Sequence, residues 1–192
     1  MRHVSDTVTG SAKLLVVGPF GVGKTTLIGT VSEIPPLRTE EQMTVASADI
    51  DSLDGVQDKT TTTVALDFGR ITLGDTVLYL FGTPGQQRFW PQWDGLAEGA
   101  IGALVLIDLR RLGESFAVLD QLDTIRLPYV VAINDFPDTP DHADDEVRQA
   151  LALPKAVVLH CDARKHRSSV DALITLVGHA LTCLDAAEAR IR

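Results

Sequence analysis

The sequence has little cysteine and no long apolar run. Its two cysteines, Cys161 and Cys183, are too few for a disulfide framework and are typical of a reduced cytosolic protein. Cys161 ends an apolar run and Cys183 lies in a helical pattern, so we expect both to serve in packing. No apolar run approaches the roughly 20 residues that cross a bilayer. These absences argue against a disulfide-stabilised secreted domain and against a membrane-spanning helix.

Positive charge is also scarce, because 17 Lys and Arg stand against 26 Asp and Glu and give a net charge of −9. Nucleic acids and anionic lipids bind basic surfaces, so neither is expected as the main partner. Arg164, Lys165 and Arg167 form either a small basic patch or a solvated loop. The first twelve residues lack the apolar core of a signal peptide, and neither end carries a lipidation signal. We expect a cytoplasmic protein whose contact with a membrane would be made through partners.

What the sequence does contain is an alternation of apolar strands and helical patterns. Its 192 residues suffice for one domain with a sizeable core. Two runs that flank Gly74 and Asp75 predict a hairpin. Apolar runs predict buried strands at 13–18, 102–109, 129–134 and 156–161. Helical patterns cover 24–32, 114–125, 144–152 and a last segment that begins near Ser168 or Ser169.

This alternation predicts an α/β fold, a mostly parallel sheet with helices on both faces. Residues 1–12 are expected to be a mobile tail and residues 13–192 a single domain. The weakest region for secondary structure is 34–59, which is long and polar. The last helix carries apolar residues at helical spacing, namely Val170, Leu173, Ile174, Val177, Leu181 and Leu184.

Residues Gly18 to Thr25, GPFGVGKT, fit the phosphate-loop pattern G-x-x-x-x-G-K-[ST], between a predicted strand and a predicted helix. Its glycines let backbone N–H groups turn toward phosphate oxygens, and the helix N-terminus adds its positive end. Lys24 would neutralise the β- and γ-phosphates, and the Thr25 hydroxyl would bind Mg²⁺. The loop alone does not separate GTPases from ATPases or small-molecule kinases. The residues expected to hold the phosphates are Phe20, Gly21, Val22, Gly23, Lys24, Thr25 and Thr26.

Further motifs follow in a fixed order. Thr60 to Thr63 precede VALDFGRI, another strand ends in GTPGQQRF, and Asn134 ends a third. This order resembles that of the Ras-like small GTPases over Lys13 to Leu184. The segments DKTTTTVALDFGRI, FGTPGQQRF, LVLIDLRR and CDARKHRSSV are more similar to the bacterial MglA-like branch, and most similar to GTPases encoded in actinobacterial conservon clusters. The resemblance implies a P-loop NTPase fold with Mg²⁺ and GTP or GDP.

The resemblance also implies roles for residues of two nucleotide-sensing segments, the first and second switches. Thr63 would bind Mg²⁺ and the γ-phosphate, with Thr62 as the alternative register, although both could simply be β-branched strand starters. Gly85 would sense the γ-phosphate, and Gln86 would orient the attacking water unless it is an exposed loop residue. Four neighbouring residues, Arg88, Phe89, Trp90 and Trp93, are either core anchors or a partner surface.

Four features depart from the Ras-like pattern. Gly82 replaces the Asp that holds a metal-bound water, and Asp108 is the nearest alternative carboxylate unless it caps a turn. Phe20 would crowd the γ-phosphate side of the loop. No arginine finger is evident within the chain. The segment from Arg38 to Asp58 makes the first switch unusually long.

The base-reading motif departs as well. The pattern Asn-Lys-x-Asp corresponds to Asn134-Asp135-Phe136-Pro137, so the expected carboxylate is displaced to Asp138. Asn134 and Asp138 are nevertheless the candidate guanine readers, and the backbone N–H of Ala163 would face the base. Asp162 either fixes that loop or belongs to a plain turn.

The combined interpretation is a GTP-binding switch that hydrolyses GTP slowly without an activating partner, with Lys24, Thr63 and Gln86 as its catalytic residues. Partners implied by the resemblance are a roadblock-type protein, a histidine-kinase-like sensor at the membrane and an activating protein. An adaptor that holds nucleotide without useful turnover is the main alternative. A small-molecule phosphotransferase would leave GTPGQQRF unexplained.

Overall fold

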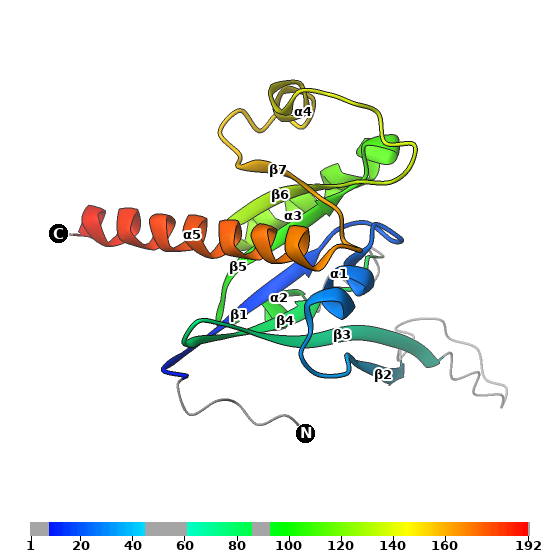
Figure 1. Ribbon diagram of the computed structural model, residues 1–192, viewed down its shortest axis with the longest axis vertical. Helices are drawn as coiled ribbons and strands as arrows, with labels where there is room; N and C mark the ends of the chain where they lie inside the picture. Colours follow the sequence, from blue (N-terminus) through cyan, green and yellow to red (C-terminus); the bar gives the residue numbers. More distant parts are fainter. Residues whose placement is uncertain (1–7, 45–60, 86–92, 192) are drawn as a thin grey trace, which may run out of the picture.

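A mixed sheet forms the centre of the structure, a computed structural model that describes residues 8–44, 61–85 and 93–191. Seven strands lie in the order β2-β3-β4-β1-β5-β6-β7 (Figure 1). β1, β4, β5, β6 and β7 run parallel to one another, and β3 is antiparallel to both of its neighbours. The strands are β1 (Gly10–Val17), β2 (Leu37–Thr44), β3 (Thr61–Leu73), β4 (Thr76–Gly82), β5 (Ala100–Ile107), β6 (Tyr129–Asn134) and β7 (Val158–Cys161).

Helices cover both faces of this sheet, which confirms the predicted α/β fold. The helices α1 (Lys24–Val31) and α5 (His166–Ile191) pack on one face. The other face carries α2 (Trp93–Ala97), α3 (Phe116–Ile125) and α4 (Asp144–Ala150). A 3₁₀ segment, η2 (Leu109–Ser115), joins β5 to α3.

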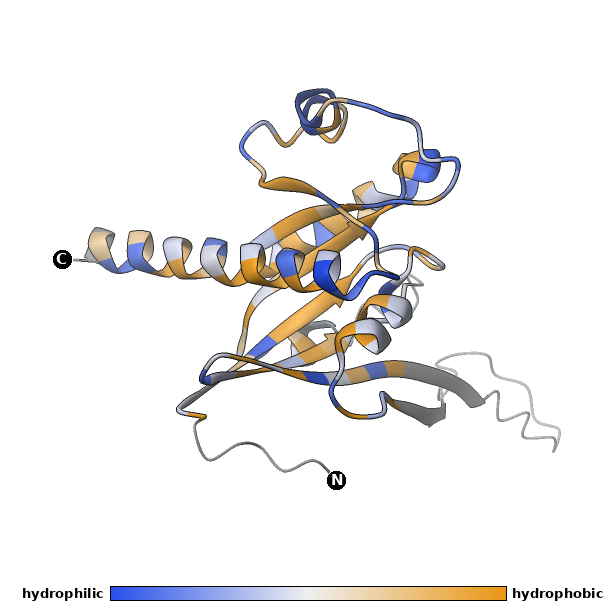
Figure 2. Cartoon of the chain, viewed as in Figure 1, coloured by the Kyte–Doolittle hydropathy of each residue, from blue (hydrophilic) through white to orange (hydrophobic). Residues whose placement is uncertain are grey.

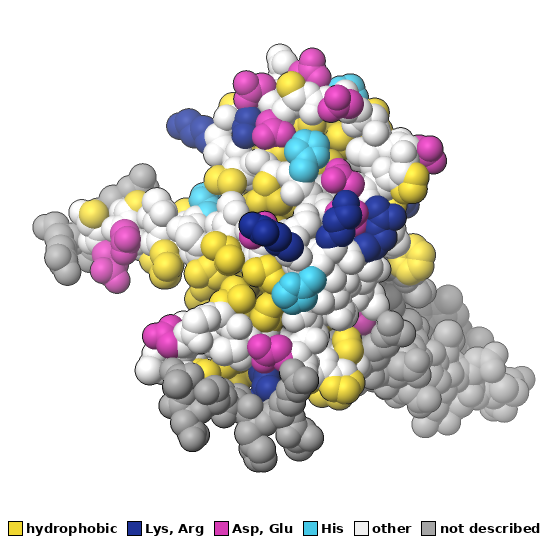
Figure 3. Space-filling model, viewed as in Figure 1, with side chains coloured by type: hydrophobic (Ala, Val, Ile, Leu, Met, Phe, Trp, Pro, Cys, Tyr) yellow, Lys and Arg dark blue, Asp and Glu magenta, His cyan; other side chains and the backbone are white. Residues whose placement is uncertain are grey.

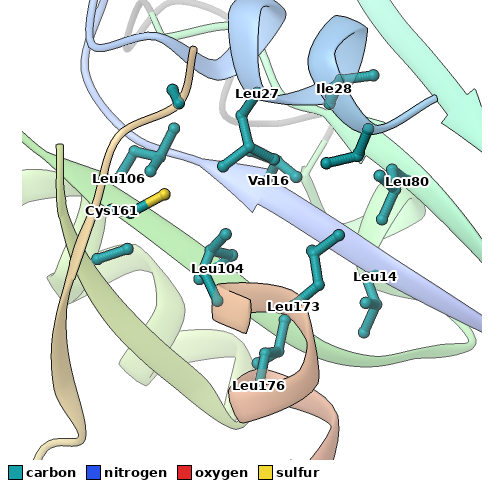
Figure 4. Packing of buried hydrophobic residues seen from close by; sticks show 14 of the residues in the cluster. Leu14, Val16, Leu27, Ile28, Leu80, Leu104, Leu106, Cys161, Leu173 and Leu176 are labelled. Carbon is teal, nitrogen blue, oxygen red and sulfur yellow. The ribbon is translucent and has the colours of Figure 1, made fainter. Parts of the chain in front are cut away.

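The core follows from the alternation of side chains along the central strands. In β1, Leu14 and Val16 face α1 and α5, whereas Leu15 and Val17 face the opposite helices. All four are fully buried, as parallel strands covered on both faces require. Figure 4 shows the first of these two layers, where leucines of the sheet meet those of α1 and α5. The central strands are accordingly coloured as hydrophobic along most of their length in Figure 2.

The predicted hairpin is present, with Gly74 and Asp75 between β3 and β4. The predicted tail is too long, because β1 begins at Gly10 and its first residues pair with the start of β4. The polar region 34–59 was expected to lack clear structure, yet its first part forms β2, which pairs antiparallel with β3. A long β3 would otherwise expose an unpaired edge, and β2 covers it.

The last helix buries only part of the predicted stripe, because Leu173 is fully buried and Val170 and Val177 pack partly buried against the core. Its other buried apolar side chains, Ala172, Leu176 and Ala180, lie outside the predicted stripe. Ile174, Leu181 and Leu184 are about half exposed, with 52%, 52% and 48% of their surface accessible. By length and composition α5 could cross a membrane, contrary to the sequence expectation. Since Leu173 and Leu176 pack against the sheet, we interpret it as a core helix of the domain.

We predict that Leu176→Ala lowers the free energy of unfolding by about 2–5 kcal/mol, because it leaves a cavity between α5 and the sheet. Leu181→Ala, the same change on the exposed side of the same helix, should cost less than about 1 kcal/mol. Urea unfolding measures both losses, provided that the dependence of the unfolding free energy on urea concentration is the same in the variants and the parent. Equal losses for the two variants would contradict the packing of α5 described above.

Candidate functional site

The carboxyl ends of β1, β4, β5, β6 and β7 meet at one edge of the sheet, since these strands are parallel. Ligands of open α/β sheets bind in the loops that follow such ends. The phosphate loop, the Gly82–Gly85 segment, η2 and the loops after β6 and β7 all begin there. Figure 3 shows Lys and Arg side chains gathered with acidic ones near these loops. This edge is therefore the candidate site.

The phosphate loop joins β1 to α1, as its sequence pattern predicts. Gly21 and Gly23 have φ values of 76° and 106°, which glycine adopts without steric cost. Helix α1 begins immediately afterwards with no side-chain cap and no acidic residue in its first turn. Its first N–H groups are therefore open to an anion at the positive end of the helix.

Lys24 lies across the loop and is only 9% exposed. Its Nζ donates to the carbonyl oxygens of Gly18 at 2.7 Å and Pro19 at 2.8 Å. Burial lowers the pKa of Lys24 to about 8, and the negative charge of Asp67 partly opposes this. The ammonium is thus held in place by neutral carbonyls, which a phosphate can replace with a stronger, charge-assisted partner.

The Thr25 hydroxyl donates to the carboxylate of Asp67 in β3. Asp67 pairs in the hairpin with Gly82, the residue in the slot of the missing Asp. A Cβ at position 82 would lie 3.0 Å from the Asp67 Cβ and 2.9 Å from Ile28 Cδ1. The Asp67 side chain therefore lies beside Gly82, and a larger residue at position 82 would have to displace Asp67 or Ile28.

These groups fit Mg²⁺, which prefers oxygen ligands and is usually bound by one or two carboxylates together with substrate phosphates. Thr25 and Asp67 supply a hydroxyl and a carboxylate. The Thr83 hydroxyl, next to Gly82, is buried without a hydrogen-bond partner among the described residues. The same residues contain no group of three or more His, Cys, Asp or Glu able to hold a metal alone. A metal here would be held jointly with a nucleotide.

Asp108 is not the substitute carboxylate that the sequence suggested. It accepts from the Arg110 backbone N–H at 3.0 Å and so caps η2. Its carboxylate also binds the Arg110 side chain through two nitrogens, at 2.9 and 2.8 Å. These bonds, chiefly that from the Arg110 side chain, hold the pKa of Asp108 below its ordinary value. The capping alternative is confirmed, and the carboxylate beside Thr25 belongs to Asp67.

Gly85 lies against the phosphate loop, where the γ-phosphate sensor was predicted. A Cβ built on it would come within 2.6 Å of the Phe20 backbone nitrogen and 2.9 Å of Lys24 Nζ. The Phe20 side chain was expected to crowd the γ-phosphate side of the loop. It is 69% exposed, so in the described part of the chain it does not pack into the loop. Gln86 lies outside those residues, as do Arg88, Phe89 and Trp90, and their roles stay predictions.

Two further predicted residues are placed by the structure. Thr63 lies within β3 and pairs with Gln42, four residues before Asp67. At about 3.3 Å per strand residue, Thr63 lies about 13 Å from Asp67 along β3. Its binding to Mg²⁺ stays a prediction, and it would require this end of β3 to move toward Asp67. Trp93 is fully buried, which favours the core-anchor alternative for this aromatic residue.

Asn134 joins the phosphate loop to the loop after β7. Its Nδ2 donates to the Val22 carbonyl at 2.9 Å, and its Oδ1 accepts from the Ala163 N–H at 3.0 Å. The side chain is only 4% exposed. The Ala163 N–H was expected to face a base, but here it is bound to Asn134 instead. The nitrogen and the oxygen of the Asn134 side-chain amide are thus both hydrogen-bonded within the protein.

Asp138, the displaced candidate base reader, lies exposed in a turn and acts electrostatically on Arg110. Within the described part of the chain it makes no hydrogen bond to Asn134. Asp162 does fix its loop, since it accepts from the Arg164 backbone N–H at 3.1 Å and from Arg164 Nε at 2.8 Å. These bonds hold the pKa of Asp162 well below its usual range.

Sequence reasoning missed two residues at this site, Asp67 and Arg111. Asp67 is signalled by the hairpin turn, which sets it opposite Gly82, the slot of the missing carboxylate. Arg111 Nη2 donates to the Phe20 carbonyl at 3.3 Å. Nothing in its sequence neighbourhood distinguishes it from Arg110, so only the folded structure separates the two.

We predict that phosphate binding weakens as pH rises above about 8, because Lys24 then loses its proton in the free protein. Affinity should fall by up to about tenfold per pH unit, and each binding event should take up one proton. Titration calorimetry near pH 7 and pH 9, in buffers of different ionisation enthalpy, measures both. Equal affinity and no proton uptake at the higher pH would refute this.

We also predict that Gly82→Asp destabilises the protein by about 1–3 kcal/mol through overpacking. The new carboxylate would also face that of Asp67. In the double variant Gly82→Asp, Asp67→Ala the loss should be smaller than the sum of the two single losses. A thermodynamic cycle from urea unfolding tests this, with Gly82→Ala as the steric control, and strict additivity would contradict the contact.

Comparison with known proteins supports the nucleotide assignment. The chain is 30% identical over 167 residues to an uncharacterised protein of Methanocaldococcus jannaschii, a match that covers 86% of this chain and 94% of that protein. The G domain of the T. maritima FeoB iron transporter has the same fold, with a TM-score of 0.57 and 14% identity over 85% of this chain and 99% of that one. A family model described as conserved hypothetical ATP binding protein matches residues 16–183. The chain therefore belongs to this P-loop family of conserved hypothetical ATP binding proteins.

Proposed function

We propose that the protein is a nucleotide switch that binds GTP with Mg²⁺ and hydrolyses it slowly to GDP. The observation that carries the proposal is the contact of Gly85 with the phosphate loop. Gly85 lies close to both Lys24 Nζ and the Phe20 backbone nitrogen, so a γ-phosphate in that space must displace or engage it. A phosphate-dependent position of this segment is what a switch requires.

The residues of the site suit phosphoryl transfer to water. The α1 N-terminus and Lys24 would bind the phosphates, and Thr25 with Asp67 would hold Mg²⁺, which neutralises charge on the β- and γ-oxygens. With Mg²⁺ and nucleotide bound, the Thr25 hydroxyl would leave the Asp67 carboxylate to hold the metal, and Asp67 would stay within reach as a carboxylate partner. Gln86 remains the proposed group that orients the attacking water.

The choice of base is the open part of the proposal. Guanine is favoured by the Ras-like order of motifs and by Asn134 at the end of β6. Adenine is favoured by the description of the family. The bond between Asn134 and Ala163 occupies two groups that were expected to read guanine, so it adds no support for guanine. Pro137 also stands where a guanine-binding carboxylate is expected. We retain GTP as the substrate, with ATP as the competing candidate.

Signalling with partner proteins is a further part of the proposal. The narrower likeness to MglA-like and conservon-encoded GTPases motivates a roadblock-type partner, a sensor-kinase-like partner and an activating protein in the cytoplasm. An adaptor that holds nucleotide without turnover is the second candidate. Gly82 first favoured it, but Asp67 now supplies a carboxylate beside Thr25, which weakens that argument.

We predict that GTP displaces bound labelled GDP at least tenfold better than ATP does, a difference of about 1.4 kcal/mol. Lys24→Ala should weaken both GDP and GTP by at least about tenfold, because the loop loses its only built-in cation. Lys155→Ala, an exposed lysine remote from the loop, is the control and should bind normally. Competition binding with the folded variants measures these affinities.

Two results would count against the proposal. Equal displacement by ATP and GTP would remove the guanine assignment and leave a less selective P-loop protein. Unchanged affinity in Lys24→Ala would remove the phosphate-loop assignment altogether. Nucleotide released from the heat-denatured protein, identified by chromatography, provides an independent reading of the base.

A further inference from the structure

Arg111 is an arginine that reaches the phosphate loop from η2. Its Nη2 donates to the Phe20 carbonyl at 3.3 Å and would lie 3.8 Å from a Cβ built on Gly21. β5 pairs with β1, and η2 follows β5, so η2 begins beside the phosphate loop. The two segments are in close contact, because a Cβ built on Gly18 would lie 2.4 Å from the Leu106 carbonyl oxygen at the end of β5. The guanidinium thus sits at the same residue, Phe20, whose nitrogen is approached by Gly85.

The neighbouring Arg110 is fixed elsewhere. It makes two short hydrogen bonds to the Asp108 side chain and stacks on the Phe136 ring, with Cζ 4.0 Å from the ring centre. Arg111 is held by longer contacts, at 3.4 Å to Asp108 and 3.1 Å to Glu114, and its side chain is 40% exposed. The pair with Glu114 is exposed on both sides and contributes little stability. Asp108 is buried, but it keeps its two bonds to the Arg110 side chain when Arg111 leaves, so Arg111 can exchange both carboxylates for another anion at small cost.

We propose that Arg111 is a built-in catalytic arginine, which moves from Asp108 and Glu114 onto the phosphates of bound nucleotide. The inference rests on the proposed function, because it assigns the cation that neutralises charge during the proposed hydrolysis. A bidentate guanidinium matches phosphate oxygens better than it matches its present long contacts.

The step itself forms and breaks one bond each. Water oxygen bonds to the γ-phosphorus while the bond from the γ-phosphorus to the β–γ bridging oxygen breaks. The electron pair of that bond stays on the β-phosphate, and both protons of the water leave with inorganic phosphate. Arg111 forms no covalent bond. It stabilises negative charge that grows on the bridging and γ-oxygens, so it contributes most in the transition state.

The experiment compares single-turnover phosphate release from radiolabelled GTP, with a parallel series on ATP, in the parent, Arg111→Ala and Arg111→Lys proteins. Arg111→Ala should slow release at least about tenfold while changing GDP affinity less than about threefold. It should also lose capture of aluminium fluoride with GDP, which mimics the transferring group. Arg111→Lys should be intermediate in both measurements, because it keeps the charge without the planar fork.

Two controls separate catalysis from local structure. Glu114→Gln breaks the outer ion pair but leaves the guanidinium, so its release rate should equal or exceed that of the parent. Arg148→Ala removes an arginine of α4 whose contacts lie within α4 and at Ala156, and its rate should be unchanged. Thermal unfolding checks that each variant is folded.

Each outcome decides the inference. Parental rates and parental fluoride capture in Arg111→Ala would overturn it and leave the proposed function standing. Loss of release in Glu114→Gln equal to that in Arg111→Ala would assign Arg111 a purely structural role and overturn it as well. A parent protein that binds nucleotide but neither releases phosphate nor captures fluoride also overturns it, in favour of the adaptor. Failure of the parent to bind either nucleotide would instead remove the proposed function.

Discussion

The position of the phosphate loop between the ends of β4 and β5 is the constraint on which the rest of the site depends. Each neighbouring segment sends one contact to this loop. β3 provides Asp67 to Thr25, β6 provides Asn134 to the Val22 carbonyl, and η2 provides Arg111 to the Phe20 carbonyl. Because these contacts converge on eight consecutive residues, a phosphate that enters the loop affects three separate segments, two strands of the sheet and η2.

Much of this arrangement could be predicted from the sequence, and the reasons differ between residues. Local patterns are enough to predict the buried parallel strands and the phosphate loop, because apolar runs indicate the strands and the spacing of the glycines indicates the loop. Asp67 required one more step, the two-residue turn at Gly74 and Asp75, which sets it opposite Gly82. Strand β2 and the part of the buried face of α5 formed by Ala172, Leu176 and Ala180 could not be predicted in this way, because pairing with β3 and the close approach of these side chains depend on the assembled sheet.

At the part of the site where the base was expected to bind, the sequence predicts the position of Asn134 correctly but not its hydrogen-bond partners. Asn134 was expected to read a base, and it does stand at the end of β6 beside the phosphate loop. Its amide instead connects Val22 with Ala163 and leaves neither of its polar atoms without a protein partner. Sequence patterns give the location of such a residue but not its hydrogen bonds, because a buried amide can bind any group that the fold brings within reach.

The two carbonyl bonds of Lys24 change the meaning of any energy measured at this residue. In the free protein its ammonium is already satisfied by Gly18 and Pro19, and a phosphate has to replace these contacts. Truncating the side chain therefore removes stabilising bonds from the reference state as well as from the complex. A loss of affinity in such a variant reports the difference between two sets of contacts, and it understates the full strength of the lysine–phosphate interaction.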